Sequence, residues 1–263
     1  MIGYPNPKQR IAAGIGCHRP AIIRNDAFAS ARALSKKVIY FFKLASGVGY
    51  RFDVEFDRPP ASGDLPEWTL LEADRCPHCP LPNTAGACCP AAADLVPIVE
   101  RFSALSSIDR VEVHVVTPQC EARKHTDTQT ALRALMGLIL ATGACPILAR
   151  MRPLAHMHMP FATGTEIVYR IVSMHLFGRF LRAEPVGLDG LDEFFSDIEK
   201  LNLAFFGRLK RAVQRDAGIN ALVALHSHSM LASLSLKPEM ENIRAWFQQT
   251  PAGEPVPEPG SGA

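Results

Sequence analysis

Residues 48–56 carry the pattern that most restricts the fold of this chain. Every second position is apolar, and charged side chains fill the positions between them from Arg51 onward: Val48, Tyr50, Phe52, Val54 and Phe56 form the apolar set. A period of two places successive side chains on opposite faces, so the run predicts a strand with one buried and one solvated face. An aromatic and β-branched run precedes it at 37–43, beyond the turn residues 45–47, and the two segments predict an antiparallel hairpin.

The remainder of the first half predicts further strands around one helix. Residues 67–74 read as a third strand, and apolar positions recur at helical spacing over 91–105. Residues 110–117 and 120–125 predict two more strands joined by a turn at Pro118. We therefore expect an antiparallel sheet with a helix packed on it.

The second half predicts helices. Thr126-x-x-Gln129 and Thr163-x-x-Glu166 have the spacing of capping boxes, and Gly143 suits the left-handed residue that ends many helices. Further helices are expected from 189 or 190 to about 209, over 220–234 and over 238–247. The basic residues at 208–215, Arg208 among them, are expected on a solvated face.

These elements predict an α+β fold, with an N-terminal antiparallel sheet carrying one helix, followed by a C-terminal helical bundle. The expected divisions are a flexible arm at 1–36, a sheet half with a cysteine loop at 37–126, a helical half at 127–249 and a disordered tail at 250–263. Proline content and the lack of periodicity are the reasons for setting both ends apart.

Composition narrows the class of partner. The net charge of +2 gives no electrostatic reason to expect nucleic acid or an acidic membrane surface. The sequence shows no secretory signal and no apolar run of the roughly 20 residues that span a bilayer. A soluble cytoplasmic protein is expected, with a homo-oligomer and an unidentified small molecule left open as partners.

The chain has seven cysteines, and their grouping is the strongest chemical signal. An odd number without a secretory signal indicates reduced thiols, which in clusters often bind metals. Cys76-Pro-His-Cys79 can direct two sulfurs at one ion, and a third ligand follows at Cys88 or Cys89. Which of these two adjacent residues is the ligand stays open.

Proline follows four of the cysteines directly, and this regularity selects a ligand set: Cys76, Cys79, Cys89 and Cys145. Proline fixes the backbone beside the sulfur and also follows a ligand in bacterial iron–sulfur loops. We expect a zinc site, with an iron–sulfur cluster as the alternative. The fourth ligand could instead be His78, His156 or His158, and thiols packed in the core without any metal are the plain structural alternative.

A second group of polar residues follows Cys145 in a segment, 145–166, that is expected to be largely non-repetitive. Arg150 and Arg152 could hold a carboxylate or a phosphate, and His158 or His156 could act as a general base. These residues make a hydrolase or a transferase the alternative function. A helical oligomerisation or interaction module without metal is a third possibility.

The chain resembles an uncharacterised bacterial family across residues 38–230. The resemblance lies in five short motifs: Cys76–Leu81, Gly143–Pro146, Arg152-Pro153, His158–Ala162 and Glu166–Arg170. They correspond to a Cys-x-x-Cys-Pro-Leu loop, a Gly-x-Cys-Pro turn, an Arg-Pro pair, a His-x-Pro-Phe-Ala stretch and a Glu-x-x-Tyr-Arg helix. The resemblance implies no activity, but it does imply that the cysteine loop and the histidine segment belong to one unit.

Overall fold

The computed structural model describes residues 37–212 and 236–248, and every structural statement below concerns these residues. The expected α+β class is confirmed. Four strands form one antiparallel sheet in the order β2-β1-β3-β4. They are β1 (Lys37–Leu44), β2 (Gly49–Glu55), β3 (Arg110–Val116) and β4 (Glu121–Asp127). The expectations for 1–36, 220–234 and 250–263 lie outside the described residues.

The expected hairpin is confirmed, and its register puts Tyr40 opposite Phe52. On β1 the even-numbered side chains from Val38 to Leu44 are buried, and on β2 Phe52 and Val54 are buried. β1 pairs antiparallel with both β2 and β3, so β2 and β3 run in the same direction with β1 between them. The chain must therefore cross the sheet to reach β3, and this crossover carries the cysteine loop.

Residues 67–74 were expected to form a third strand, and this expectation is wrong. Glu67–Thr69 form a short 3-10 helix, η2, and turns follow it. The segment's contribution to β-pairing is an isolated bridge between Leu70 and Cys88. The side chain of Arg208 binds four carbonyl groups of the segment, which leaves fewer of them to pair with a neighbouring strand.

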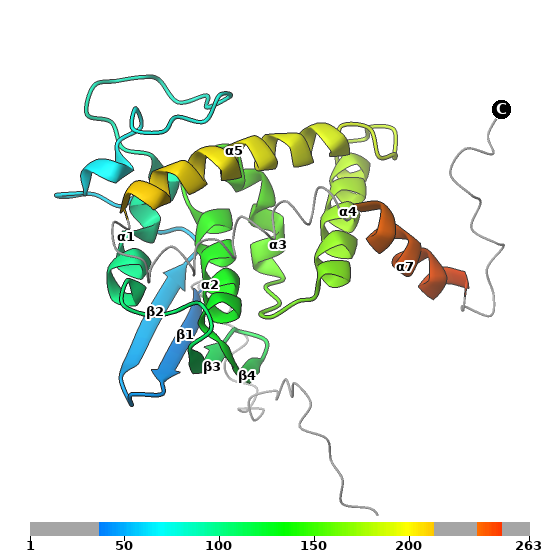
Figure 1. Cartoon of the computed structure of the whole chain (residues 1–263). Helices are drawn as coiled ribbons and strands as arrows, with labels where there is room; N and C mark the ends of the chain where they lie inside the picture. Colours follow the sequence, from blue (N-terminus) through cyan, green and yellow to red (C-terminus); the bar gives the residue numbers. More distant parts are fainter. Residues whose placement is uncertain (1–36, 213–235, 249–263) are drawn as a thin grey trace, which may run out of the picture.

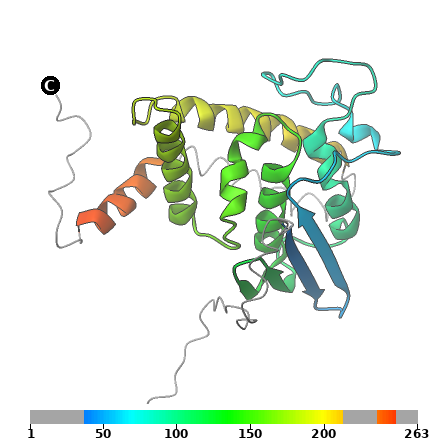
Figure 2. The ribbon, with the colours of Figure 1, turned by 180° about the vertical axis from the view of Figure 1, so that it is seen from behind.

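The helices are α1 (Pro90–Phe102), α2 (Thr128–Thr142), α3 (Arg152–His156), α4 (Gly164–Leu181), α5 (Leu191–Ala212) and α7 (Leu236–Gln248), with a 3-10 turn η3 (Leu148–Met151). In Figures 1 and 2, α1 and α2 lie beside the sheet, and α5 crosses over α2, α3 and α4. The C-terminal end of α5 reaches the segment that precedes α1. No helix among the described residues is long and apolar enough to cross a membrane.

The N-terminal ends of α4 and α2 are capped in different ways. The capping box at Thr163 and Glu166 is confirmed, with both reciprocal hydrogen bonds present. The box expected at Thr126 is wrong, because Asp127 caps α2 by accepting the amide of Thr130. A carboxylate is as good an N-cap as a hydroxyl, and Thr126 still belongs to the strand before it.

Gly143 ends α2 with φ −77° and ψ −177°, so the left-handed conformation expected there is wrong. The reason for glycine is proximity: a Cβ at this position would lie 2.4 Å from Oδ2 of Asp94. The segment 145–166 is also more regular than expected, because η3 and α3 occupy residues 148–156. Pro153 favours this short helix, since proline fits the first turn.

A single core cluster joins the two halves of the chain. It combines side chains of the sheet with others from α1, α2, η3, α3 and α5, and Tyr40, Leu95, Leu135 and Leu201 are among its members. A second cluster packs α4, α5 and α7 together through residues such as Val168, Phe194 and Ile243. The expected boundary near residue 126 is therefore crossed by continuous packing.

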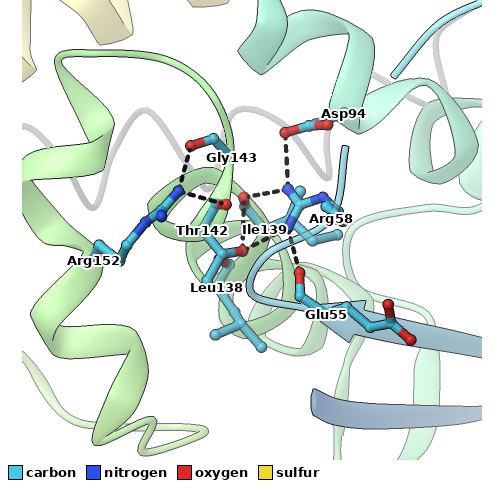
Figure 3. Close-up of polar contacts among 8 residues, drawn as sticks. All are labelled: Glu55, Arg58, Asp94, Leu138, Ile139, Thr142, Gly143 and Arg152. Carbon is cyan, nitrogen blue, oxygen red and sulfur yellow. Dashed lines mark hydrogen bonds and ion pairs between the residues drawn. The ribbon is translucent and has the colours of Figure 1, made fainter. Parts of the chain in front are cut away.

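Arg58 holds the crossover against the end of α2. Its guanidinium donates to Glu55 O at 3.1 Å, to Thr142 Oγ1 at 2.7 Å and to Ile139 O at 2.8 Å. It also pairs with Asp94 on α1, with Nη2 and Oδ2 2.8 Å apart. Figure 3 shows these contacts converging on the last turn of α2. A cation is favourable there because the last carbonyls of a helix have no internal partner.

Arg58→Ala should destabilise the fold by roughly 3 kcal/mol, because it leaves the Asp94 carboxylate buried without its partner. Burial already raises the pKa of Asp94, and Arg58 opposes that rise only in part. A carboxyl whose pKa is raised in the folded state costs stability above that pKa, and the cost falls as pH drops toward it. Thermal unfolding should therefore show a smaller loss for Arg58→Ala in mildly acidic than in neutral buffer.

Arg51→Ala is the matched control, since Arg51 pairs with Asp53 on the solvated face of the sheet. It should change the unfolding midpoint far less than Arg58→Ala at either pH. A similar loss in the two variants would contradict the structural role assigned to Arg58.

Candidate functional site

The cysteine loop follows η2 and begins with a tight turn. The amide of Cys79 donates to the carbonyl of Cys76 at 3.0 Å, which closes the Cys-Pro-His-Cys segment on itself. Both thiols are half-buried and pack against the main core. Arg75 reinforces the turn by donating to the carbonyls of Cys79 and Leu81.

Cys89 and Cys145 lie in two Cys-Pro turns of the same local form. Cys89 is the N-cap of α1, with Pro90 in the first helical position. The Cys89 sulfur accepts hydrogen bonds from the amides of the second and third residues after it, Ala91 and Ala92. The Cys145 sulfur accepts from the corresponding amides, those of Ile147 and Leu148. Amides at the start of a helix stabilise negative charge, so these contacts lower the pKa of both thiols, although the larger effect of burial leaves each pKa raised.

The structure brings these four sulfurs into one neighbourhood. Burial raises the pKa of Cys76 to about 12, and the thiols of Cys89, Cys79 and Cys145 add to the rise in that order. Burial also raises the pKa of Cys89 and that of Cys145, with smaller contributions from the neighbouring thiols. In the part of the chain that the structure describes, however, no three His, Cys, Asp or Glu side chains are arranged as ligands of one ion.

The remaining described cysteines lie apart from this group. The Cys88 sulfur accepts a hydrogen bond from the Thr69 hydroxyl, with 3.5 Å between the sulfur and the oxygen. Cys89 has extended dihedral angles, and successive side chains of extended backbone point in opposite directions. The geometry therefore favours Cys89 over Cys88 as the third cysteine of the proposed ligand set. Cys120 is disulfide-bonded, so the expectation of reduced thiols is wrong for this residue.

Arg208 on α5 is the charged residue that sequence reasoning missed. It was expected on a solvated face, but it is only 1% exposed. Its guanidinium donates to four carbonyls of the segment before the cysteine loop: those of Trp68, Leu70, Leu71 and Asp74. Its position on the helix gave the available signal, because Arg208 falls three residues after Phe205 on the buried stripe of α5.

The Arg208 charge acts on the thiols. It lowers the pKa of Cys76 and that of Cys89, against the larger effect of burial on each. The salt bridges that we find among the described residues give Arg208 no carboxylate partner, whereas the neighbouring Arg211 pairs with Asp74 at 3.2 Å. A buried guanidinium held only by carbonyls is favourable where an anion is also close, and thiolates would be such anions.

The histidines named as alternative ligands lie in different surroundings. Both ring nitrogens of His78 are buried without a hydrogen bond in the structure, and Nε2 is 3.9 Å from Asp197 Oδ1. His156 is exposed and packs its ring edge-on against Phe56. His158 Nε2 lies 2.6 Å from the Tyr40 hydroxyl. Of the three, His78 alone belongs to the cysteine loop.

His158, Arg150 and Arg152 are not brought together as one site. Arg150 pairs with Asp197 at 2.8 Å and lies over the Phe194 ring. Arg152 donates to the carbonyls of Thr142 and Gly143, both at 3.3 Å, and so helps to cap α2 (Figure 3). The two guanidinium groups thus have structural contacts of their own.

The His158 imidazole is poorly suited to act as a general base near neutral pH. Burial lowers its pKa to about 4, with a further contribution from the Arg170 charge. Burial also raises the pKa of Tyr40 well above its usual value, so the phenol and the imidazole form a neutral hydrogen-bonded pair. A catalytic base works best with a pKa near the operating pH, and about 4 is far below it.

Comparison with known proteins gives one match. Residues 38–248 match the model of a family described as a domain of unknown function, DUF6901. No curated protein and no solved structure matches the chain. The expected resemblance to an uncharacterised family is confirmed.

Arg208→Met should loosen the cysteine loop, because it leaves carbonyls without donors at about 1–3 kcal/mol for each buried group. In metal-free protein, a thiol reagent should label Cys76 and Cys79 faster, by about tenfold or more if local opening becomes easier by about 1.4 kcal/mol. Mass spectrometry of the labelled peptides measures this rate site by site. Lys210→Met, at an exposed position of the same helix, should leave the rates unchanged.

Proposed function

Since the chain belongs to the DUF6901 family, whose description names no function, we propose from its own residues that it is a metal-binding protein in which four thiolates hold one zinc ion: Cys76, Cys79, Cys89 and Cys145. The support is the pair of matching Cys-Pro turns, which direct amides at the sulfurs of Cys89 and Cys145 beside the Cys-x-x-Cys turn. Four thiolates are a common ligand set of structural zinc.

Charge balance supports the same proposal. Zinc with four thiolates carries net negative charge, which is costly in a core unless a cation is near. Arg208 supplies that cation from α5, and its fixed hydrogen bonds to the η2 segment hold it in place. Without metal, the raised pKa values of Cys76, Cys89 and Cys145 keep these three thiols protonated, and neutral thiols have no strong attraction for one another. Zinc would replace those protons and draw the sulfurs to about 2.3 Å from the ion.

The site would act structurally. Its ligands come from the crossover loop, the start of α1 and the turn after α2, so one ion would bind the sheet half to the helical half. A four-iron cluster is the alternative occupant, because proline also follows a ligand in some iron–sulfur loops. The hydrolase or transferase alternative has less support, since His158, Arg150 and Arg152 face different partners.

Protein purified under reducing conditions with zinc present should contain about one zinc ion per chain. Cys79→Ser and Cys145→Ser should both lose the metal and lower the midpoint of a single unfolding transition, because metal binding free energy is here folding free energy. A chelator should lower the midpoint of the parent protein in the same way. Elemental analysis and calorimetry make the two measurements.

Cys88→Ser is the matched control, because it removes a sulfur from the same loop without touching the proposed set. It should keep its zinc. Substitution with cobalt should give thiolate charge-transfer bands in the parent and in Cys88→Ser, and these bands should weaken in Cys145→Ser. Zinc retention in Cys79→Ser, or equal loss in Cys88→Ser and Cys145→Ser, would overturn the proposal, and a brown protein rich in iron would replace zinc by a cluster.

A further inference from the structure

A cavity of about 220 Å³ opens between α2, α3, α4 and α5, and none of the cysteines in the described part of the chain lines it. Most of its wall is apolar, with side chains such as Leu138, Met151, Phe161, Ile171 and Ile198. Apolar pockets between helices with a few convergent polar groups are typical binding sites for small molecules.

The charged groups of this wall are all basic. Arg133 of α2, Arg170 of α4 and His158 line the cavity, and among the residues that the structure describes no carboxylate does. The Arg170 side chain is fixed in position, because its Nη2 donates hydrogen bonds to the carbonyls of Leu154 and Met157. Burial lowers the pKa of Arg133 and that of Arg170, with Asp127 and Glu166 acting in the opposite direction. An anion in the cavity would be attracted to two partly desolvated guanidinium groups.

Gly137 provides an independent observation. It lies in the middle of α2 and lines the cavity, one helical turn after Arg133. A glycine there costs about 1 kcal/mol relative to alanine, yet a Cβ would meet nothing within 4 Å. Packing therefore does not require the glycine. Its effect is to leave the cavity open beside the arginine.

We propose that this cavity binds a small monocarboxylate with an apolar chain or ring, with the carboxylate at the Arg170 guanidinium and the apolar part among the side chains of α2, α4 and α5. The planar guanidinium matches a carboxylate with two parallel hydrogen bonds. The small share of polar wall suits a ligand with one anionic group. This inference is independent of the metal site.

Octanoate is the probe, and isothermal titration calorimetry on the full chain is the measurement. We expect one octanoate per chain, bound at least tenfold more tightly than octan-1-ol, which has the same chain without the charge. Octyl phosphate should bind more weakly than octanoate. Arg170→Met should remove the preference for octanoate over octanol, and Gly137→Trp should abolish binding of both by filling the cavity.

Gly137→Ala is the informative companion variant. It should raise the midpoint of thermal unfolding and weaken the binding of octanoate. This combination separates loss of the binding site from loss of the fold. No octanoate binding to the parent protein, or equal binding of octanoate and octanol, would overturn the proposal. Tighter binding of octyl phosphate would overturn the carboxylate assignment, and unchanged binding in Gly137→Trp would place the ligand elsewhere.

Discussion

The Arg58 guanidinium is the contact on which the arrangement of both halves depends. It binds the crossover, α1 and the last turn of α2 at once, through Glu55 O, Asp94 and Ile139 O. Asp94 follows Cys89 by little more than one helical turn, and Cys145 follows the end of α2 by three residues. The contact therefore fixes the relative position of the two Cys-Pro turns.

The Arg58–Asp94 ion pair fixes the relative position of α1 and α2 more than it adds to the net free energy of folding. The pKa of Asp94 is raised by burial in spite of Arg58, so desolvation outweighs the attraction between the two charges. Such a pair adds little relative to an apolar pair of the same shape, but it is costly to break from one side. It therefore gives one alignment of α1 and α2 a much lower free energy than alignments in which the helices are slightly displaced. Gly143 sharpens that alignment, since only glycine allows the backbone so close to Asp94.

Arginines that bind backbone carbonyls recur throughout the fold. Arg208 organises the η2 segment, Arg152 the end of α2, and Arg170 the turn after α3. Each of these segments is irregular, and irregular backbone leaves carbonyl groups without partners in a helix or a ladder. A guanidinium carries several donors in fixed geometry and can bind several such carbonyls together. The cysteine loop can therefore stay ordered without strand pairing.

The elements with strong periodicity were predictable from sequence. The β1–β2 hairpin, α1 and α5 follow from patterns of two or of 3.6 residues, because each buries one face locally, and the start of α4 follows from its capping box. The failures occurred where a distant residue decides the local structure. Arg208 binds four carbonyl groups of the turns at 67–74, and residue 143 is glycine because a Cβ there would clash with Asp94. Neither partner can be read from the local sequence.

For the candidate site, too, local sequence patterns are informative at some residues and not at others. The four cysteines that precede a proline are near one another in the fold, and Cys89 and Cys145 form equivalent turns, but their role as ligands stays a prediction. Arg150, Arg152 and His158 are close in sequence, but their side chains contact Asp197, the end of α2 and Tyr40 respectively. Adjacent residues in short helices project in different directions, so nearness along the chain does not make a site.

The position of the thiols in the core determines how loss of a bound metal would affect the stability of the two halves. Cys89 and Cys145 are buried members of the cluster that also contains Tyr40, Leu95 and Leu135, and Cys76 and Cys79 pack against it. Separating the ligands therefore requires separating the sheet from the helices. A domain boundary near residue 126 would instead allow one half to unfold while the other persisted. Because the core is continuous across that point, the energy of any bound ion is shared by the whole structure, and the two halves should unfold together.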